Sequence, residues 1–113
     1  KGIVLAGVSA GAICWFEQGI TDSVYPLGVL DCLGFLSGSS CPHYDVEPER
    51  RPAYLKFISD KAVKSGIALQ DHVAAHYVDG TLHRVVSAKE GKQAFHVSHE
   101  GEVALETEFA FLD

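Results

Sequence analysis

The residues best placed to do chemistry lie in the segment GVSAG at residues 7–11. The pattern G-x-S-x-G follows an apolar run and precedes small residues, so it predicts a strand, a sharp turn and a helix. Such a turn needs small flanking residues, here Gly7 and Gly11, and it holds the serine in a strained conformation with its hydroxyl exposed. The pattern therefore predicts Ser9 as a nucleophile. The alternative is a glycine-rich turn that caps a helix or binds phosphate.

A nucleophilic serine needs an oxyanion donor and a base. The backbone N–H of Ala10 follows Ser9 directly and can donate to the oxyanion of a tetrahedral intermediate, an interaction worth roughly 3 kcal/mol of the barrier. The base must lie within hydrogen-bonding reach of the hydroxyl. Among six histidines, we favour His43, because it lies in a loop of small residues after a predicted strand, where loops of a parallel sheet converge. His72 is the second choice.

The other histidines lie in a predicted hairpin and tail, where alternation indicates ordinary strand positions; they are His76, His83, His96 and His99. A base of this kind also needs a carboxylate that orients its imidazole. The residues themselves leave Asp22, Asp45 and Asp71 open for this role.

The elements expected to position these residues begin with an apolar run at residues 2–8, typical of a central parallel strand buried on both faces. A short helix is expected at residues 10–16. Residues 17–31 have the composition of a long loop, with a short strand near Val24. A buried strand is expected at residues 33–36, followed by a loop that carries His43.

In the second half, Pro48 suits the first turn of a helix that continues toward Gly66. The segment after it predicts a strand and then a hairpin around the turn Asp79-Gly80. Residues 93–111 alternate in places and are expected to form edge strands or a closing hairpin. No internal repeat or linker indicates a second domain.

Composition limits the function classes. The chain has 113 residues, 47% of them hydrophobic, and a formal net charge of −6. Its basic residues are scattered, which argues against nucleic acid as a partner. Neither a membrane span nor a leader peptide is apparent, so we expect a soluble cytoplasmic protein. Cys14, Cys32 and Cys41 lack the spacing of a zinc site or disulfide framework, and neither a metal nor a cofactor is expected.

Four segments together resemble peptidase E, the aspartyl dipeptidase family: GVSAGAICWF, TDS, GFLSGSSCPHYD and ERR. The resemblance runs from residue 2 to about residue 80. It implies an α/β fold, a three-layer α/β/α sandwich with a mainly parallel sheet, related to class I glutamine amidotransferases and to cyanophycinase. It also implies a serine peptidase that acts on dipeptides with an N-terminal aspartate.

Residue by residue, the resemblance assigns the nucleophile to Ser9 and the base to His43. We call the predicted sharp turn at residues 7–11 the elbow, and the strand before it and the helix after it the elbow strand and the elbow helix. The family's acidic residue after the elbow helix falls on Asp22, and a second acidic position falls near Gln70 and Asp71. We rank Asp22 ahead of Asp71 as the third catalytic residue.

The resemblance also implies an arginine that reads the substrate's aspartate side chain. This arginine falls on Arg51, or on Arg50 if the register slips by one residue. A guanidinium group suits bidentate binding of a carboxylate.

Members of this family carry about as much chain again before the elbow strand. We therefore expect residues 1–113 to be the C-terminal part of one catalytic domain, with the N-terminal half as a missing segment or a second chain. Because a half-sheet would expose unpaired edges and apolar surface, we expect a fragment, a processed subunit or one partner of a two-chain assembly. Association with another copy is a further expectation.

The expected function is hydrolysis of small peptides through a Ser-His-acid triad and an acyl-enzyme. One alternative is an esterase of the α/β-hydrolase type, in which His96 or His99 would be the base. The other is an inactive or truncated amidotransferase-like module.

Overall fold

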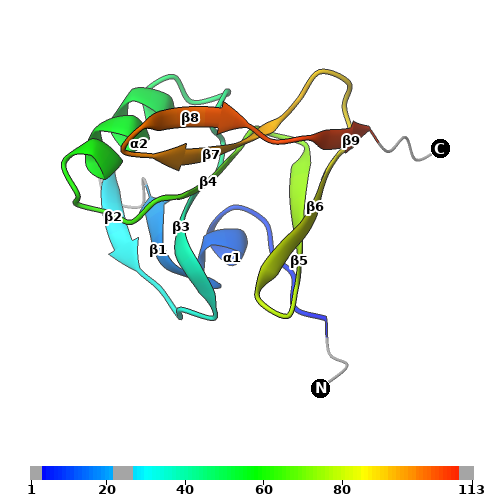
Figure 1. Cartoon of the computed structure of the whole chain (residues 1–113), viewed down its shortest axis with the longest axis horizontal. Helices are drawn as coiled ribbons and strands as arrows, with labels where there is room; N and C mark the ends of the chain where they lie inside the picture. The colour runs from blue at the N-terminus through cyan, green and yellow to red at the C-terminus, as the bar shows by residue number, and fades with distance from the viewer. Residues whose placement is uncertain (1–3, 22–26, 110–113) are drawn as a thin grey trace.

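The computed structural model describes residues 4–21 and 27–109 of the chain. Two helices and nine strands are assigned in these residues, arranged as one six-stranded and one three-stranded sheet (Figure 1). The fold is α/β with mixed sheets. The elements are α1 (Ala10–Ile13), β1 (Phe16–Thr21), β2 (Gly28–Asp31), β3 (Leu36–Cys41), α2 (Arg50–Ser59), β4 (Gly66–Leu69), β5 (Val73–Val78), β6 (Thr81–Ser87), β7 (Ala94–Ser98), β8 (Gly101–Ala104) and β9 (Thr107–Phe109).

The larger sheet has the strand order β2-β1-β3-β4-β7-β8. Its central pairs, β1 with β3 and β3 with β4, are parallel, whereas the pairs toward both edges are antiparallel. Helix α2 provides the crossover that a parallel pair needs between β3 and β4, while β7 and β8 follow each other through a tight hairpin. The described strands are thus richer in antiparallel pairs than the mainly parallel sheet that we expected.

The smaller sheet has the order β5-β6-β9 and contains the predicted hairpin. Its turn residues Asp79 and Gly80 both have positive φ, 52° and 80°. This is the backbone conformation that tight hairpin turns require. The prediction of a hairpin at this turn is confirmed, as is the closing hairpin in the tail, made by β7 and β8.

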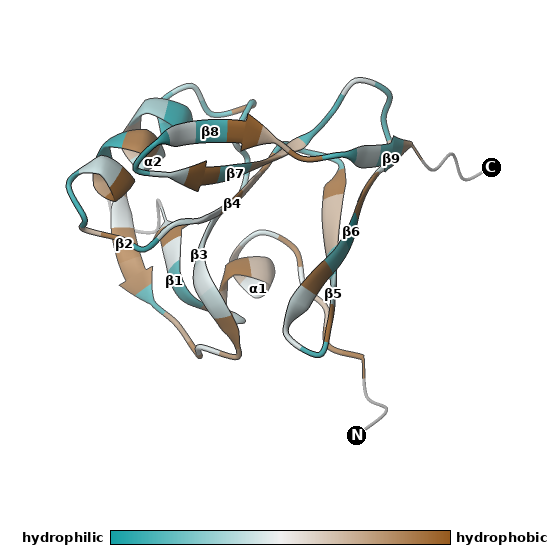
Figure 2. Ribbon diagram, viewed as in Figure 1, coloured by the Kyte–Doolittle hydropathy of each residue, from teal (hydrophilic) through white to brown (hydrophobic). Residues whose placement is uncertain are grey.

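Helix α2 covers the larger sheet and closes the main core. Tyr54 and Ile58, four residues apart on one helical face, pack with the buried Ile20, Tyr44 and Val97. Figure 2 shows hydrophilic as well as hydrophobic residues on α2, as expected of a helix with one face toward solvent. The helix was predicted but ends earlier than expected, at Ser59, because Lys61 takes a left-handed φ of 60°.

The prediction of a central strand at residues 2–8 is wrong for the part that the structure describes. Residues 4–8 form no strand, and Val4 and Val8 are 88% and 85% exposed. Figure 2 colours the described start of the segment as hydrophobic. A strand is stable only when its backbone groups pair with neighbours, and no described strand pairs with this segment.

Three further boundaries differ from the sequence-based expectation. Helix α1 is shorter than predicted, because β1 already begins at Phe16, and the expected loop at residues 17–31 contains both β1 and β2. The strand expected near Val24 falls outside the described residues. The strand expected at 33–36 instead runs over Leu36–Cys41, and Leu33 and Phe35 are exposed.

Small residues explain the position of β3. A Cβ atom on Gly66 of β4 would lie 1.9 Å from the carbonyl oxygen of Ser39. The two backbones approach so closely that only small side chains fit, and Ser39 and Ser40 are buried there. Polar composition therefore misled the sequence-based prediction of a loop. In the part of the chain that the structure describes, no helix is long and apolar enough to cross a membrane.

Candidate active site

Ser9 lies in a strained turn directly before α1. Its φ and ψ are 55° and −116°, a sparsely populated combination for a residue with a side chain. A Cβ atom at Gly7 would lie 1.9 Å from the carbonyl oxygen of Gly11, so this position requires glycine. At Gly11 an added Cβ would meet no atom of the described residues within 4 Å. The tight approach predicted for the elbow is therefore made at Gly7 alone.

His43 lies two residues beyond the end of β3, as the sequence predicted. Its φ is 55°. The next residue anchors the loop to the neighbouring strand, because the N–H of Tyr44 donates to the carbonyl of Leu69 at 3.0 Å. The N–H of Glu47 donates to the carbonyl of His43 itself at 3.3 Å. The imidazole is thus carried by a loop with defined backbone hydrogen bonds.

A chain of two hydrogen bonds joins three side chains. Ser9 Oγ lies 2.9 Å from His43 Nε2, and His43 Nδ1 lies 2.8 Å from Asp71 Oδ1. With Nδ1–H donating to the carboxylate, Nε2 is left to accept the proton of the serine hydroxyl. All three residues come from different parts of the chain, and His43 and Asp71 are both partly buried.

Asp71 follows the end of β4, the parallel neighbour of β3, so His43 and Asp71 lie at the same edge of the sheet. Its backbone N–H donates to Asp45 Oδ1 at 2.9 Å. Gln70, in the position beside it, is bonded instead to the backbone N–H of Gln93 through its Oε1 at 2.9 Å. The register therefore presents Asp71 to His43, while Gln70 joins β4 to the start of β7.

Asp45 is itself paired with the ammonium group of Lys92. Burial opposes its charge, but the hydrogen bonds from Lys92 and from the Asp71 backbone outweigh that effect and lower the pKa of Asp45 below its usual value. Asp45 is therefore ionised at neutral pH. Among the described residues, Asp45 binds the backbone of Asp71 and makes no hydrogen bond to His43.

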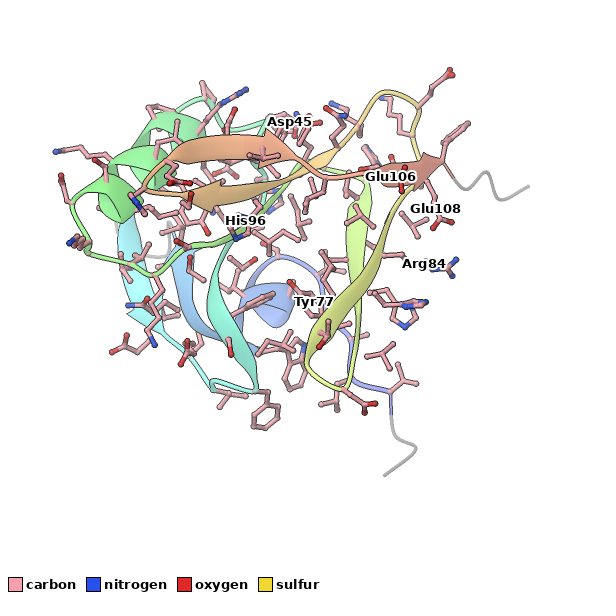
Figure 3. All side chains as sticks on the ribbon, in the orientation of Figure 1. Asp45, Tyr77, Arg84, His96, Glu106 and Glu108 are labelled. Carbon is pink, nitrogen blue, oxygen red and sulfur yellow. The ribbon has the colours of Figure 1, made fainter. Side chains whose placement is uncertain are left out.

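The three joined side chains open into a cleft of about 690 Å³. Its lining is mostly apolar, with Trp15 and Phe35 stacked at 5.7 Å between ring centroids. Figure 3 shows Tyr77 between β5 and α1, where it lines the same cleft. The lining comprises residues 4–9 and 69–77, together with Ala12, Trp15, Phe16, Phe35, Leu36, Pro42, His43 and Gly80.

The other catalytic candidates fall elsewhere. Asp22, which we ranked first as the acid, lies outside the described residues. His72 lines the cleft and is exposed, but in the described part of the chain no hydrogen bond joins it to Ser9. His96 and His99 do not line this cleft; Figure 3 shows His96 beside β7.

Neither candidate arginine lines the cleft. Arg51 pairs with Glu102 and lies over the rings of Tyr44 and Phe95, 5.6 Å from each centroid. Arg50 is buried, where its Nε donates to Glu47 at 2.7 Å and its Nη1 donates to the carbonyl of Ile20 at 3.0 Å. The described residues thus bind both guanidinium groups to other parts of the fold.

None of the three cysteines lines the described cleft. Burial raises the pKa of the Cys41 thiol to about 12, so this side chain stays protonated. Cys14, at the end of α1, donates its thiol hydrogen to the carbonyl of Gly11 at 3.2 Å. All three cysteines are free.

An α/β chain in which serine, histidine and aspartate are hydrogen-bonded in this order, with the serine in a strained turn before a helix, has the geometry of the serine hydrolases. Comparison with known proteins gives the family: the chain belongs to peptidase family S51, whose family model matches residues 1–85. A curated protein of Bacillus subtilis (strain 168), named "Uncharacterized peptidase YgaJ", is 54% identical over 97 residues, which cover 86% of this chain. The chain spans 42% of the length of that relative. No solved structure matches this chain.

Proposed function

We propose that this chain carries the catalytic residues of a serine-type peptidase. The observation that carries the proposal is the continuous hydrogen-bonded chain from Ser9 through His43 to Asp71, with distances of 2.9 and 2.8 Å. A serine hydroxyl is a weak nucleophile unless a positioned base accepts its proton. The family relationship and the name of the Bacillus subtilis relative support the peptidase class.

In the proposed first step, Ser9 Oγ attacks the carbonyl carbon of the scissile peptide bond. Its proton moves to His43 Nε2, and Asp71 accepts the Nδ1 hydrogen bond and stabilises the resulting imidazolium. The carbonyl oxygen becomes an oxyanion, to which the backbone N–H of Ala10 donates. Because Ala10 is the first residue of α1, its N–H has no partner within the helix.

The intermediate then collapses, and the bond between carbon and nitrogen breaks. His43 returns its proton to the leaving amine, and the acyl group remains on Ser9 as an ester. Water, deprotonated by His43, attacks this ester in the second half of the reaction and releases the acid. The same three side chains serve both halves.

For the substrate we propose small peptides, in particular dipeptides with an N-terminal aspartate, as the resemblance to peptidase E implies. Arg51 is the proposed reader of the aspartate carboxylate. Arg51 pairs with the carboxylate of Glu102, and a guanidinium group suits bidentate binding of carboxylates. To read a substrate, it would have to exchange Glu102 for the substrate's carboxylate.

We further propose that residues 1–113 work as the C-terminal part of a larger three-layer α/β/α domain. The support is the exposed apolar segment around Val4, Leu5 and Val8, which lines the cleft beside Ser9. Additional strands from an N-terminal half would cover this segment and supply a second oxyanion donor. Experiments on activity therefore use the complete protein that contains this chain.

The test of the proposed function is labelling of the complete protein with a fluorophosphonate, which reacts with activated serines. We expect labelling of the parent protein at Ser9, and loss of both labelling and dipeptide hydrolysis in Ser9→Ala. A Ser9→Ala variant that still hydrolyses peptides above background would overturn the proposal. Ser37→Ala, on β3, is the matched control and should label like the parent.

A further inference from the structure

Asp45 and Lys92 make contact directly behind the site. We propose that this pair is a positioning device for Asp71: Asp45 fixes the Asp71 backbone, and Lys92 neutralises Asp45, so that Asp71 alone presents an uncompensated negative charge to His43. The inference rests on the proposed function of Ser9, His43 and Asp71, and it assigns a role to two residues that the mechanism above does not use.

The backbone contact is the first part of the argument. Asp45 Oδ1 accepts the N–H of Asp71 at 2.9 Å. Asp71 follows the last residue of β4 by two positions, and the ladders of the described strands do not include it. The carboxylate of Asp45 therefore takes the place of a strand neighbour. A backbone fixed at this residue narrows the positions from which its side chain can meet His43 Nδ1.

Charge is the second part. A carboxylate on Asp45 lies close to Asp71, because it binds that residue's N–H, and two negative charges near one imidazole would both stabilise its protonated form. Lys92 removes this excess. Its ammonium group binds Asp45 Oδ2, and the pair is mostly shielded from solvent, with 16% of the Asp45 side chain and 29% of the Lys92 side chain exposed.

Hydrogen bonds of the residue next to Lys92 define where the Lys92 backbone lies. The residue next to it, Gln93, donates its N–H to Gln70 Oε1 at 2.9 Å, and the N–H of Gln70 donates to the Gln93 carbonyl at 3.2 Å. These two hydrogen bonds extend the contact between β4 and β7 by one residue, to Gln70, which directly precedes Asp71. They hold the backbone of Lys92 beside Asp45.

The other charged and titratable groups near His43 stay the same in every variant of the test. Across the cleft they are Asp71, His72 and His76, and on the side of α2 they are Glu47 and Arg50, which bind each other at 2.7 Å. Burial raises the pKa of the neighbouring Cys41 and Tyr44 to about 12 each, so both stay neutral. A change in pH dependence between variants therefore reports the Asp45–Lys92 pair.

The experiment measures the rate of fluorophosphonate labelling of Ser9 in the complete protein as a function of pH. Lys92→Gln leaves the charge of Asp45 uncompensated, so the acid limb of the profile should move to higher pH. Asp45→Asn keeps an acceptor for the Asp71 N–H but leaves Lys92 unpaired, so the limb should move to lower pH. Each shift should be about half a pH unit, the size expected for a partly screened charge near the site.

A second comparison separates position from charge. Asp45→Ala removes both the acceptor and the charge, and we expect the plateau rate to fall about tenfold, as for loss of one positioning hydrogen bond. Asp45→Asn should recover most of that loss. Lys89→Gln, in the same loop and exposed, is the control and should reproduce the parent profile.

The inference is overturned if Lys92→Gln and Asp45→Asn leave the acid limb unmoved or shift it in the same direction. It is also overturned if Asp45→Ala matches the parent rate. If Asp45→Ala fails to fold, the pH profiles of Asp45→Asn and Lys92→Gln still decide whether the inference holds. Labelling that persists in Ser9→Ala would instead contradict the proposed function itself, so the two failures are distinguishable.

Discussion

The two sides of the candidate site are held by different kinds of structure. His43 and Asp71 follow β3 and β4, neighbouring parallel strands that α2 joins and covers. Ser9 follows residues 4–8, which are exposed and pair with no described strand. The sheet of this chain therefore suffices to bring a histidine and a carboxylate together. The position of Ser9 depends on its local turn, and we propose that strands outside this chain support the segment before it.

The largest expected effect concerns the sheet side of the site. Asp71→Asn in the complete protein should lower kcat about 10⁴-fold, because an amide favours the wrong imidazole tautomer while leaving the geometry intact. Steady-state hydrolysis of an Asp-X dipeptide measures this. Asp22→Asn is the paired variant, and we expect it to stay within tenfold of the parent. A reversed ranking of the two losses would return the third catalytic role to Asp22.

The position of Ser9 in the elbow can be disrupted by substituting a single glycine. Gly7→Ala should lower the labelling rate of Ser9 about 100-fold, because the added Cβ would collide with the Gly11 carbonyl and displace the nucleophile by roughly an ångström. Gly11→Ala is the matched control, since its Cβ meets no atom of the described residues within 4 Å. Equal rates for the two variants would show that the close approach at Gly7 does not position Ser9.

Substitution of Arg51, on α2, tests whether this side chain binds the carboxylate of the substrate's aspartate. Arg51→Lys should lower kcat/KM for Asp-X dipeptides about tenfold, because lysine keeps the charge but loses the planar fork that binds a carboxylate. Neutral dipeptides such as Ala-X are the control and should be affected less than twofold. An equal loss for both substrates would mean that Arg51 acts only through its contacts with Glu102, Tyr44 and Phe95.

The smallest expected effect on activity comes from the core beneath β3. Ser39 Oγ lies 2.7 Å from the Tyr54 hydroxyl and donates to the Lys64 carbonyl at 2.6 Å. Ser39→Ala should lower the free energy of unfolding by about 2 kcal/mol, because it leaves a buried hydroxyl without this partner. Activity of the folded protein should change less than twofold. Chemical denaturation and dipeptide hydrolysis measure the two quantities, and a large loss of kcat would show that the sheet transmits this change to His43.

Much of the local structure could be predicted. The turn Asp79-Gly80 gave the hairpin β5–β6, the pattern after Pro48 gave α2, and His43 was placed correctly after a strand. The errors share a cause. Residues 4–8 have the composition of a buried strand but lack a described partner, and Ser39 and Ser40 look like loop residues but lie in β3, since Gly66 approaches so closely that only small side chains fit. In both cases the neighbouring segments, and not the segment's own composition, decide whether it forms a strand.

The candidate carboxylate illustrates the same limit. The sequence left Asp22, Asp45 and Asp71 open, and the resemblance ranked Asp22 first. One signal favoured Asp71: it comes just after β4, so it must lie at the edge of the sheet where the neighbouring parallel strand delivers His43. Using that signal required knowledge that β3 and β4 are adjacent, which only the assembled sheet provides.

The sequence by itself determined the elbow, because a strained turn around Ser9 demands glycine at Gly7 and such steric demands are local. Tertiary structure alone decided which carboxylate meets the histidine, with His43 and Asp71 separated by 28 positions. It also brought Asp45 and Lys92, which are 47 positions apart, into contact beside Asp71. Contacts across such separations depend on strand pairing and chain crossover, which propensity and spacing within one segment do not encode.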